Sequence, residues 1–148
     1  MRAVMQRVSF ARVVVADEVV GEIAQGLLVF LGIGKKDDIQ QAQALDQKIV
    51  SMRLFSDVAH KMNLSLKEVA GSCLVVSQFT LFADISHGRR PFFGEAQEPE
   101  AARVLCDYFV NYVKEQGVMV ASGRFGAMMQ VSLCNDGPVT IYLDTDEF

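Results

Sequence analysis

The first third of the chain carries the apolar pattern of β-strands. Residues 3–23, AVMQRVSFARVVVADEVVGEI, hold β-branched side chains in near alternation and predict two or three strands, with a break at 16–18 and an end near Gly21. Residues 26–33, GLLVFLGI, are apolar throughout, which is typical of a strand covered on both faces. A buried sheet is therefore expected at the start of the fold.

Two later segments show helical spacing. The first begins with Asp37 as N-cap, since Asp37 and Gln40 form a capping-box pattern, and it ends near residues 55–57. The second has Pro99 near its first position and Gly117 as its C-terminal stop. The apolar positions that recur at helical spacing are Leu45, Ile49 and Met52 in the first helix, and Val104, Leu105, Tyr108, Phe109, Tyr112 and Val113 in the second.

The remaining apolar runs predict further strands. Residues 72–84, SCLVVSQFTLFAD, are the strongest candidate for a central strand. Shorter runs around 118–122, 127–134 and 139–144 finish the chain. Residues 85–97, ISHGRRPFFGEAQ, are polar and irregular and predict a loop.

The order of these elements predicts the fold class. Strands, helix, strand, helix and strands follow one another, with two helices for roughly seven strands and no internal repeat. Hydrophobic residues make up 51% of the chain and charged residues 22%, as in globular domains. We therefore expect a single α+β domain over residues 1–148, with a largely antiparallel sheet or open β-barrel and two main helices packed outside it.

Charge and targeting signals bear on location and partners. The formal net charge is −4, which does not by itself favour a nucleic-acid ligand, although a local basic patch is compatible with one. The N-terminus carries Arg2 and Arg7 and no apolar signal-peptide core. No apolar run approaches the roughly 18 to 20 residues of a membrane helix. We therefore expect a cytoplasmic protein with no membrane partner.

The cysteines and histidines match no metal or disulfide pattern. Cys73, Cys106 and Cys134 show no CxxC spacing, and His60 and His87 lie in polar stretches. Buried, unreactive thiols are the favoured interpretation, and no metal or other cofactor is expected. A cysteine hydrolase that pairs Cys73 or Cys134 with one histidine is the less favoured alternative.

Polar side chains interrupt the predicted central strand at Ser77, Gln78 and Thr80. In a strand, Gln78 and Thr80 share one face and Ser77 points to the other. An unsatisfied buried amide costs about 1 to 3 kcal/mol, so Gln78 must bond a neighbouring backbone group or border a polar pocket. The pattern alone is compatible with both.

Residues 135–140, NDGPVT, predict a tight turn between the last two strands. A cis bond, found at about 5 to 6% of X-Pro positions in folded proteins, would aim two successive carbonyl oxygens in one direction here. Two such acceptors suit an ammonium group. Just upstream, Phe125 and Met129 lie among small residues in ASGRFGAMMQVSL and form either a pocket wall or a packed corner of the core.

Taken together, SQFTL at 77–81 and NDGPVT at 135–140 resemble the two signature motifs of the D-aminoacyl-tRNA deacylases. The resemblance extends over nearly the whole chain, through QRVSFARVVV, GLLVFLGI, KMNLSL, RRPFF and SGRFGAMMQVSL. The chain departs from the family at Phe92 and Ser122, where a small polar residue and threonine are common. Both motifs are intact and lie in the family's order and separation.

The resemblance implies a homodimer with two active sites at its interface. Each site joins the SQFTL strand of one subunit to the Gly-Pro turn of the other, and the family's cis bond corresponds to Gly137-Pro138. The turn holds the substrate amino group and excludes L side chains, while Arg7 matches the family arginine that fixes it. The substrate-binding residues so implied are Gly137, Pro138, Phe125, Met129 and Arg7.

The implied reaction is hydrolysis of the ester of D-aminoacyl-tRNA, a tRNA-editing step that also removes glycine mischarged on alanine tRNA. No His or Lys is adjacent in sequence to activate Thr80 as a nucleophile. The expected catalytic groups are therefore positioning residues and oxyanion donors that assist attack by water, helped by the substrate 2′-hydroxyl. They are Thr80, Gln78, Ser77 and the backbone amide of Phe79. No cofactor is implied.

Two further questions stay open at the level of sequence. The basic side chains outside the motifs are either phosphate contacts for tRNA or ordinary solvated charges. They are Lys35, Lys36, Lys61, Arg89 and Arg90. The absence of an evident catalytic base also motivates an alternative from a different class, a dimeric, non-catalytic module that binds an RNA end or a small amine.

Overall fold

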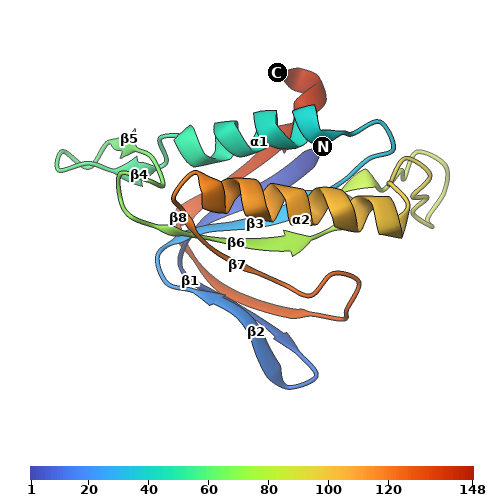
Figure 1. The fold of residues 1–148 in the computed structure, drawn as a ribbon, viewed down its shortest axis with the longest axis horizontal. Coiled ribbons are helices and arrows are strands. Elements are labelled where there is room, and N and C mark those ends of the chain that lie inside the picture. Colours follow the sequence, from blue (N-terminus) through green and yellow to red (C-terminus); the bar gives the residue numbers. More distant parts are fainter.

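A mixed six-stranded sheet forms the centre of the computed structural model, which describes residues 1–148 (Figure 1). Its strands are β1 (Arg2–Val15), β2 (Glu18–Ile23), β3 (Gly26–Gly32), β6 (Ser72–Ser77), β7 (Met119–Ser122) and β8 (Gln130–Asp144). The first half of β1 pairs antiparallel with β3 and the second half with β2, while β8 runs antiparallel along the opposite edge of β1. The pairs β3–β6 and β6–β7 are parallel. The sheet is therefore largely antiparallel, as predicted, with two parallel crossovers.

The sheet curls until β2 approaches β7. A Cβ atom added at Gly21 would lie 2.6 Å from the carbonyl oxygen of Ser122, so only a residue without a side chain permits this approach. The two strands share no ladder, and the sheet is a nearly closed barrel rather than a sealed one. The prediction of an open barrel is confirmed.

Two helices cover one face of the sheet, side by side, as Figure 1 shows. They are α1 (Ile39–Ser51) and α2 (Pro99–Glu115). Between them, the Gln43 side-chain amide donates to the Tyr108 hydroxyl at 2.7 Å, and the Gln47 amide donates to the Tyr112 hydroxyl at 3.2 Å. The α+β class with two helices outside the sheet is confirmed.

The core occupies both faces of the sheet. Leu27, Val29 and Leu31 of β3 are fully buried against the helices, whereas Leu28 of the same strand is buried inside the curl. The second cluster inside the curl includes Val8. The continuous apolar run of 26–33 is therefore explained by burial on both faces, as predicted.

The helix boundaries differ slightly from those predicted. Asp38, not Asp37, is the N-cap of α1, and its capping box is completed by Gln41 rather than Gln40. The Asp37 carboxylate accepts instead from the backbone N–H of Gly34 at 2.6 Å, which removes it from the cap. In α2, Pro99 begins the helix and Gly117 follows its end as predicted, but Val104 is exposed and does not belong to the buried face.

The predicted central strand of 72–84 is too long. β6 ends at Ser77, and the chain turns into a short 3₁₀ helix, η1 (Phe79–Phe82). The partner strand β3 ends at Gly32, so the last ladder-like bond runs from the Gln78 N–H to the Leu31 carbonyl at 2.8 Å. Gln78 and Thr80 therefore do not share one face of a strand, because both lie beyond its end.

The predicted turn between two final strands is also wrong. β8 is one strand of 15 residues, and NDGPVT lies within it. The smaller elements are the hairpin of β4 (Phe55–Ser56) and β5 (Met62–Leu64) and the terminal 3₁₀ helix η2 (Thr145–Glu147). The first helix was expected to end near residues 55–57, but α1 ends at Ser51 and β4 occupies residues 55–56.

Candidate active site

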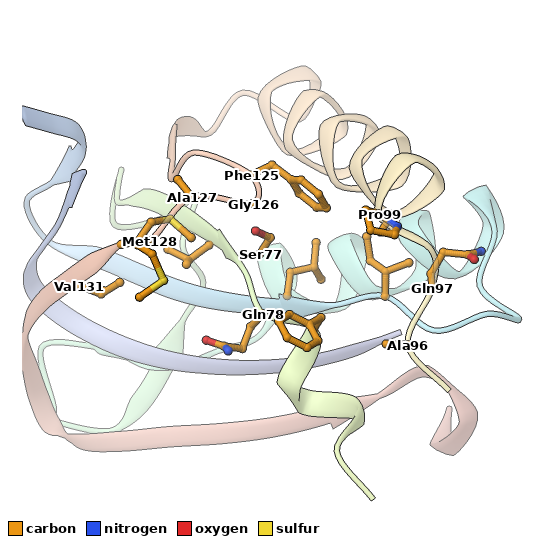
Figure 2. A pocket seen from close by; sticks show the side chains of 16 residues that line it. Ser77, Gln78, Ala96, Gln97, Pro99, Phe125, Gly126, Ala127, Met128 and Val131 are labelled. Carbon is orange, nitrogen blue, oxygen red and sulfur yellow. The ribbon is translucent and has the colours of Figure 1, made fainter. Parts of the chain in front are cut away.

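A cavity of about 550 Å³ opens at the end of β6 (Figure 2). Four segments line it: the end of β3, the end of β6 with the start of η1, the chain that leads into α2 with the first turn of that helix, and the connection from β7 to β8 with the start of β8. The residues from these segments that matter below are Ser77, Gln78, Phe79, Gln97, Phe125 and Met129. No charged side chain lines the cavity, so its polar groups are neutral hydroxyls, amides and backbone atoms.

The polar corner of the cavity is formed by the SQFTL segment. Ser77 and Gln78 are half-buried, and both line the cavity. The Gln78 side-chain amide donates a hydrogen bond to the hydroxyl of Thr80, which is exposed just outside the lining. Of the two possibilities that the sequence left open for Gln78, the structure shows the second: Gln78 borders a pocket, and the partner of its amide is a side-chain hydroxyl and not a backbone group.

Aromatic and sulfur-containing side chains supply the apolar wall. Phe79 packs edge-on against Phe93 with ring centroids 5.0 Å apart. Phe125 and Met129 also line the cavity, which favours the pocket-wall interpretation over a packed corner. Met128 beside them is 93% exposed.

The Gly137-Pro138 segment forms an excursion from the β1–β8 ladder. Gln6 pairs with Thr140 and Val8 pairs with Asn135, so four β8 residues, 136–139, stand opposite Arg7 alone. The Gly137-Pro138 peptide bond is cis, as the resemblance implied.

Gly137 and Arg7 fix the shape of this excursion. Gly137 has φ +152°, and an added Cβ atom would lie 2.8 Å from the Val139 nitrogen, so a side chain is disfavoured by both conformation and contact. Arg7 donates from Nε to the Asp136 carbonyl oxygen at 2.8 Å and from Nη1 to the Leu54 carbonyl.

The predicted site residues therefore fall into two groups within one chain. Ser77, Gln78, Phe79, Phe125 and Met129 share the cavity, with Thr80 beside it. The second group, which consists of Arg7, Gly137 and Pro138, does not line it. Asp136, Gly137 and Pro138 are exposed.

Sequence reasoning missed two groups of residues. Gln97 and Pro99 line the cavity because an isolated bridge between Gly34 and Ala96 holds their segment beside β3, and no local pattern signals that contact. Asn135, whose side chain bonds the backbone of Val139, was also missed, although an Asn shortly before a glycine is a known signal for side-chain-stabilised turns.

The basic candidates lie outside the cavity. Lys35, Lys36, Lys61, Arg89 and Arg90 are all exposed. The backbone of Lys35 is held beside the lining segment, since its N–H donates to the Glu95 carbonyl at 3.0 Å.

The thiols do not support a cysteine hydrolase. Cys73 and Cys106 are buried as predicted, and burial raises the pKa of Cys73 to about 12 and that of Cys106 to about 11. Cys134 is exposed, so the expectation that it is buried is wrong. None of the three lines the cavity.

Neither helix combines the length and the hydrophobicity needed to cross a membrane. No three His, Cys, Asp or Glu side chains lie together in a way that would hold a metal ion.

Comparison with known proteins places the chain in one family. The model of the family "D-Tyr-tRNA(Tyr) deacylase" matches residues 4–144. A D-aminoacyl-tRNA deacylase of Roseiflexus sp. (strain RS-1) is 54% identical over 148 residues, covering 100% of this chain and 96% of the relative. The D-aminoacyl-tRNA deacylase of Pelobacter propionicus is 56% identical over 144 residues, covering 97% and 99%.

Two solved structures share the fold. One, described as "c-Myc DNA Unwinding Element Binding Protein", has a TM-score of 0.92 and 36% identity, and the match covers 97% of this chain and 98% of that one. Another, described as a probable eukaryotic D-amino acid tRNA deacylase, has a TM-score of 0.84 at 18% identity, covering 96% and 97%, and supports the fold alone. With a family match over residues 4–144 and full-length relatives above 50% identity, the chain belongs to the D-Tyr-tRNA(Tyr) deacylase family.

Proposed function

We propose that this enzyme hydrolyses the ester bond that joins a D-amino acid to the 3′-terminal ribose of tRNA, releasing free D-amino acid and tRNA. The observation that carries the proposal is the family match over residues 4–144, which includes the Ser77–Phe79 segment at the cavity. The reaction removes a wrongly attached amino acid, so it is a tRNA-editing reaction, and we place it in the cytoplasm, where tRNA is charged.

Catalysis rests on positioning and on stabilisation of the oxyanion. Ser77, Gln78 and the backbone amide of Phe79 hold the ester and donate hydrogen bonds to the oxygen that becomes negative when water attacks. Phe79 is the first residue of η1, and N–H groups at the start of a helical turn have no partner within that turn. The partner of the Thr80 hydroxyl is the Gln78 amide rather than a base, so the substrate 2′-hydroxyl assists the attacking water.

The Gly137-Pro138 turn of a second copy serves as the chirality filter. The turn is exposed and does not line the cavity of its own chain, which leaves it available to the cavity of a partner in a homodimer. Its backbone carbonyl oxygens bind the substrate ammonium group, and an L side chain clashes with the backbone where a D side chain points away. Glycine presents no side chain to reject, so glycine mischarged on alanine tRNA is also removed.

A second candidate function is nucleic-acid binding without turnover. It is favoured by the 36% identity and the TM-score of 0.92 to a structure described as a DNA-unwinding-element binding protein. The neutral lining of the cavity and the overall charge of −4 argue against an extended nucleic-acid surface around it.

Deacylation of matched esters separates the two candidates. Purified protein is incubated with D-tyrosyl-, L-tyrosyl- and glycyl-tRNA, and the remaining ester is followed over time. Rapid loss of the D and glycyl esters with the L ester spared supports the editing enzyme and its filter. Survival of all three esters, together with retained tRNA binding, would replace the proposal with the binding module.

A further inference from the structure

We propose that Asn135 is a positioning residue that fixes the Gly137-Pro138 turn from its C-terminal side. The inference rests on the proposed function, in which this turn reads the substrate amino group. The β1–β8 ladder stops at Asn135 and resumes at Thr140, so the residues between them receive no support from β1 through regular backbone pairing.

The Asn135 side chain supplies the missing pairing for Val139. Its Oδ1 accepts from the Val139 N–H at 2.7 Å, and its Nδ2 donates to the Val139 carbonyl at 3.2 Å. A carboxamide offers one acceptor and two donors, and this arrangement uses the same donor and acceptor pair that a neighbouring strand would use. The excursion is thereby closed into a loop of fixed width around Gly137 and Pro138.

A second contact anchors the Asn135 side chain to β1. The Thr140 hydroxyl accepts from Asn135 Nδ2 at 3.1 Å and from the Gln6 side-chain amide at 3.1 Å. The amide plane of Asn135 is therefore fixed by three hydrogen bonds. Arg7 holds the other flank through the Asp136 carbonyl at 2.8 Å. The turn is clamped on both sides, and its backbone oxygens are presented in one orientation.

The chemistry of the clamp requires an amide and not a carboxylate. In Asn135→Asp, which has nearly the same size, one oxygen still accepts from the Val139 N–H, but the other faces the Val139 carbonyl and repels it. Asn135→Ala removes all three hydrogen bonds. Ser132→Ala, at an exposed position of the same strand, is the matched control.

The first measurement does not depend on any enzymatic activity. Hydrogen exchange of the Val139 amide is compared in the wild type and in the three variants. We expect exchange at Val139 to be about tenfold faster in Asn135→Ala, intermediate in Asn135→Asp and unchanged in Ser132→Ala, because of the three bonds lost in Asn135→Ala one is that of the Val139 N–H itself, and about 1.4 kcal/mol corresponds to tenfold. Unchanged exchange in Asn135→Ala would overturn the clamp, even if the wild type proves to be inactive on every tRNA ester.

The second measurement asks whether the clamp serves chiral selection. We expect kcat/KM for D-tyrosyl-tRNA to fall roughly 10- to 100-fold in Asn135→Ala, because misplacement of a positioning group by about 1 Å has effects of this size. The ratio of D to L rates should fall as well, with partial recovery in Asn135→Asp, whereas a purely structural role would lower Tm without changing the ratio. A wild-type ratio in Asn135→Ala, with faster exchange at Val139, would overturn the positioning role, and an inactive wild type would overturn the proposed function instead.

Discussion

The Thr80 hydroxyl and the Gln78 amide form one unit at the edge of the cavity. Because Thr80 accepts a hydrogen bond from Gln78, we infer that it holds that amide in place. We predict that Thr80→Ala lowers kcat for D-tyrosyl-tRNA by roughly 3- to 10-fold, the effect of one hydrogen bond of about 1 kcal/mol. Thr80→Ser keeps the hydroxyl and should stay near the wild-type rate. Complete loss of turnover in a folded, tRNA-binding Thr80→Ala protein would identify Thr80 as a nucleophile instead.

Gly137 is the residue at which a side chain is least tolerated in the turn. Its φ of +152° and the 2.8 Å separation between an added Cβ atom and the Val139 nitrogen both oppose substitution. We predict that Gly137→Ala lowers the free energy of unfolding by about 1 to 3 kcal/mol and strongly reduces D-ester hydrolysis.

Thermal unfolding and deacylation rates, measured together, check this prediction. Gly117→Ala is the control, because Gly117 also has a positive φ, of +86°, but an added Cβ atom there meets nothing within 4 Å. It should lose stability and keep its activity. Wild-type activity in Gly137→Ala would show that the turn tolerates a changed shape.

The cysteines are predicted to be dispensable. Burial raises the pKa of Cys73 to about 12, so this thiol is protonated at neutral pH and is not a nucleophile. A protein with Cys73→Ala, Cys106→Ala and Cys134→Ala should retain turnover of D-tyrosyl-tRNA at close to the wild-type kcat. Loss of turnover in a protein with an unchanged fold would restore the cysteine-hydrolase alternative.

The sequence predicted some residues at the cavity and missed others, depending on whether the residue leaves a local signal in the sequence. Ser77, Gln78 and Thr80 were predicted because a polar interruption in an apolar run is visible in the sequence, whereas Phe79 was predicted through its backbone amide within the same motif. Gln97 was not, because it reaches the cavity through a long-range bridge that leaves no local signal. Asn135 differs, because an Asn shortly before a glycine is a local turn signal, but its hydrogen bonds to Val139 and Thr140 depend on an excursion that no periodicity predicts.

Asp46 is an unusual feature of helix α1. It is fully buried, and neither carboxylate oxygen has a hydrogen-bond partner. Burial raises the pKa of Asp46 to about 7, an effect that the nearby Gln116 amide and the Lys67 charge only partly offset. The folded protein therefore holds a proton on Asp46 at pH values where the unfolded chain has released it.

This proton makes the stability depend on pH in a definite direction. The folded pKa of Asp46 is raised above its ordinary value of 3.8, so the stabilising contribution of the neutral form is complete below about pH 4 and is lost as the pH rises to about 7. We predict that the free energy of unfolding falls by about 3 to 4 kcal/mol over this range from this group alone, because the pKa differs by about three units and each unit corresponds to about 1.36 kcal/mol.

Urea unfolding at several pH values checks the prediction. In Asp46→Asn, the side chain cannot lose a proton, so the part of the decline that comes from this position should vanish. Asp57→Asn, in the exposed hairpin β4–β5, is a comparison variant in which the pKa is lowered rather than raised, because the Lys61 backbone N–H bonds the carboxylate. An equal pH dependence in the wild type and in Asp46→Asn would show that Asp46 is charged in the folded protein.

At the scale of elements, sequence predicted which segments form regular structure better than where they end. The helical spacing located α1 and α2, yet the N-cap moved by one residue because Asp37 bonds Gly34 instead. β6 was predicted to continue to residue 84 because its apolar pattern continues, but a strand ends where its partner ends, and β3 stops at Gly32. The length of a strand thus depends on the strand with which it pairs as well as on its own sequence.

For the whole molecule, the separation of the two groups of site residues predicts complementation between subunits. In the proposed dimer, Gln78→Ala damages the cavity of its own chain, whereas Gly137→Ala damages the turn that reaches the partner's cavity. In a mixed dimer, one site carries both changes and the other carries neither. We predict that two inactive homodimers, after mixing and subunit exchange, recover about a quarter of the wild-type activity, since half of the dimers are mixed and each has one intact site.

Deacylation before and after exchange measures this recovery. Mixing each variant with itself is the control and should restore nothing. Absence of recovery, with mixed dimers present by mass spectrometry, would mean that the turn acts on the cavity of its own chain or not at all.

The excursion at residues 136–139 has a consequence for solubility. β8 pairs only with β1, so its other side is a free sheet edge along a strand of 15 residues, long enough to recruit another extended chain. Because the excursion interrupts the regular backbone in the middle of that edge, only two short stretches, 130–135 and 140–144, are left to pair. The irregularity that interrupts the ladder with β1 thus also protects the protein from edge-to-edge aggregation, and a shortened β8 without it would be more prone to form fibrils.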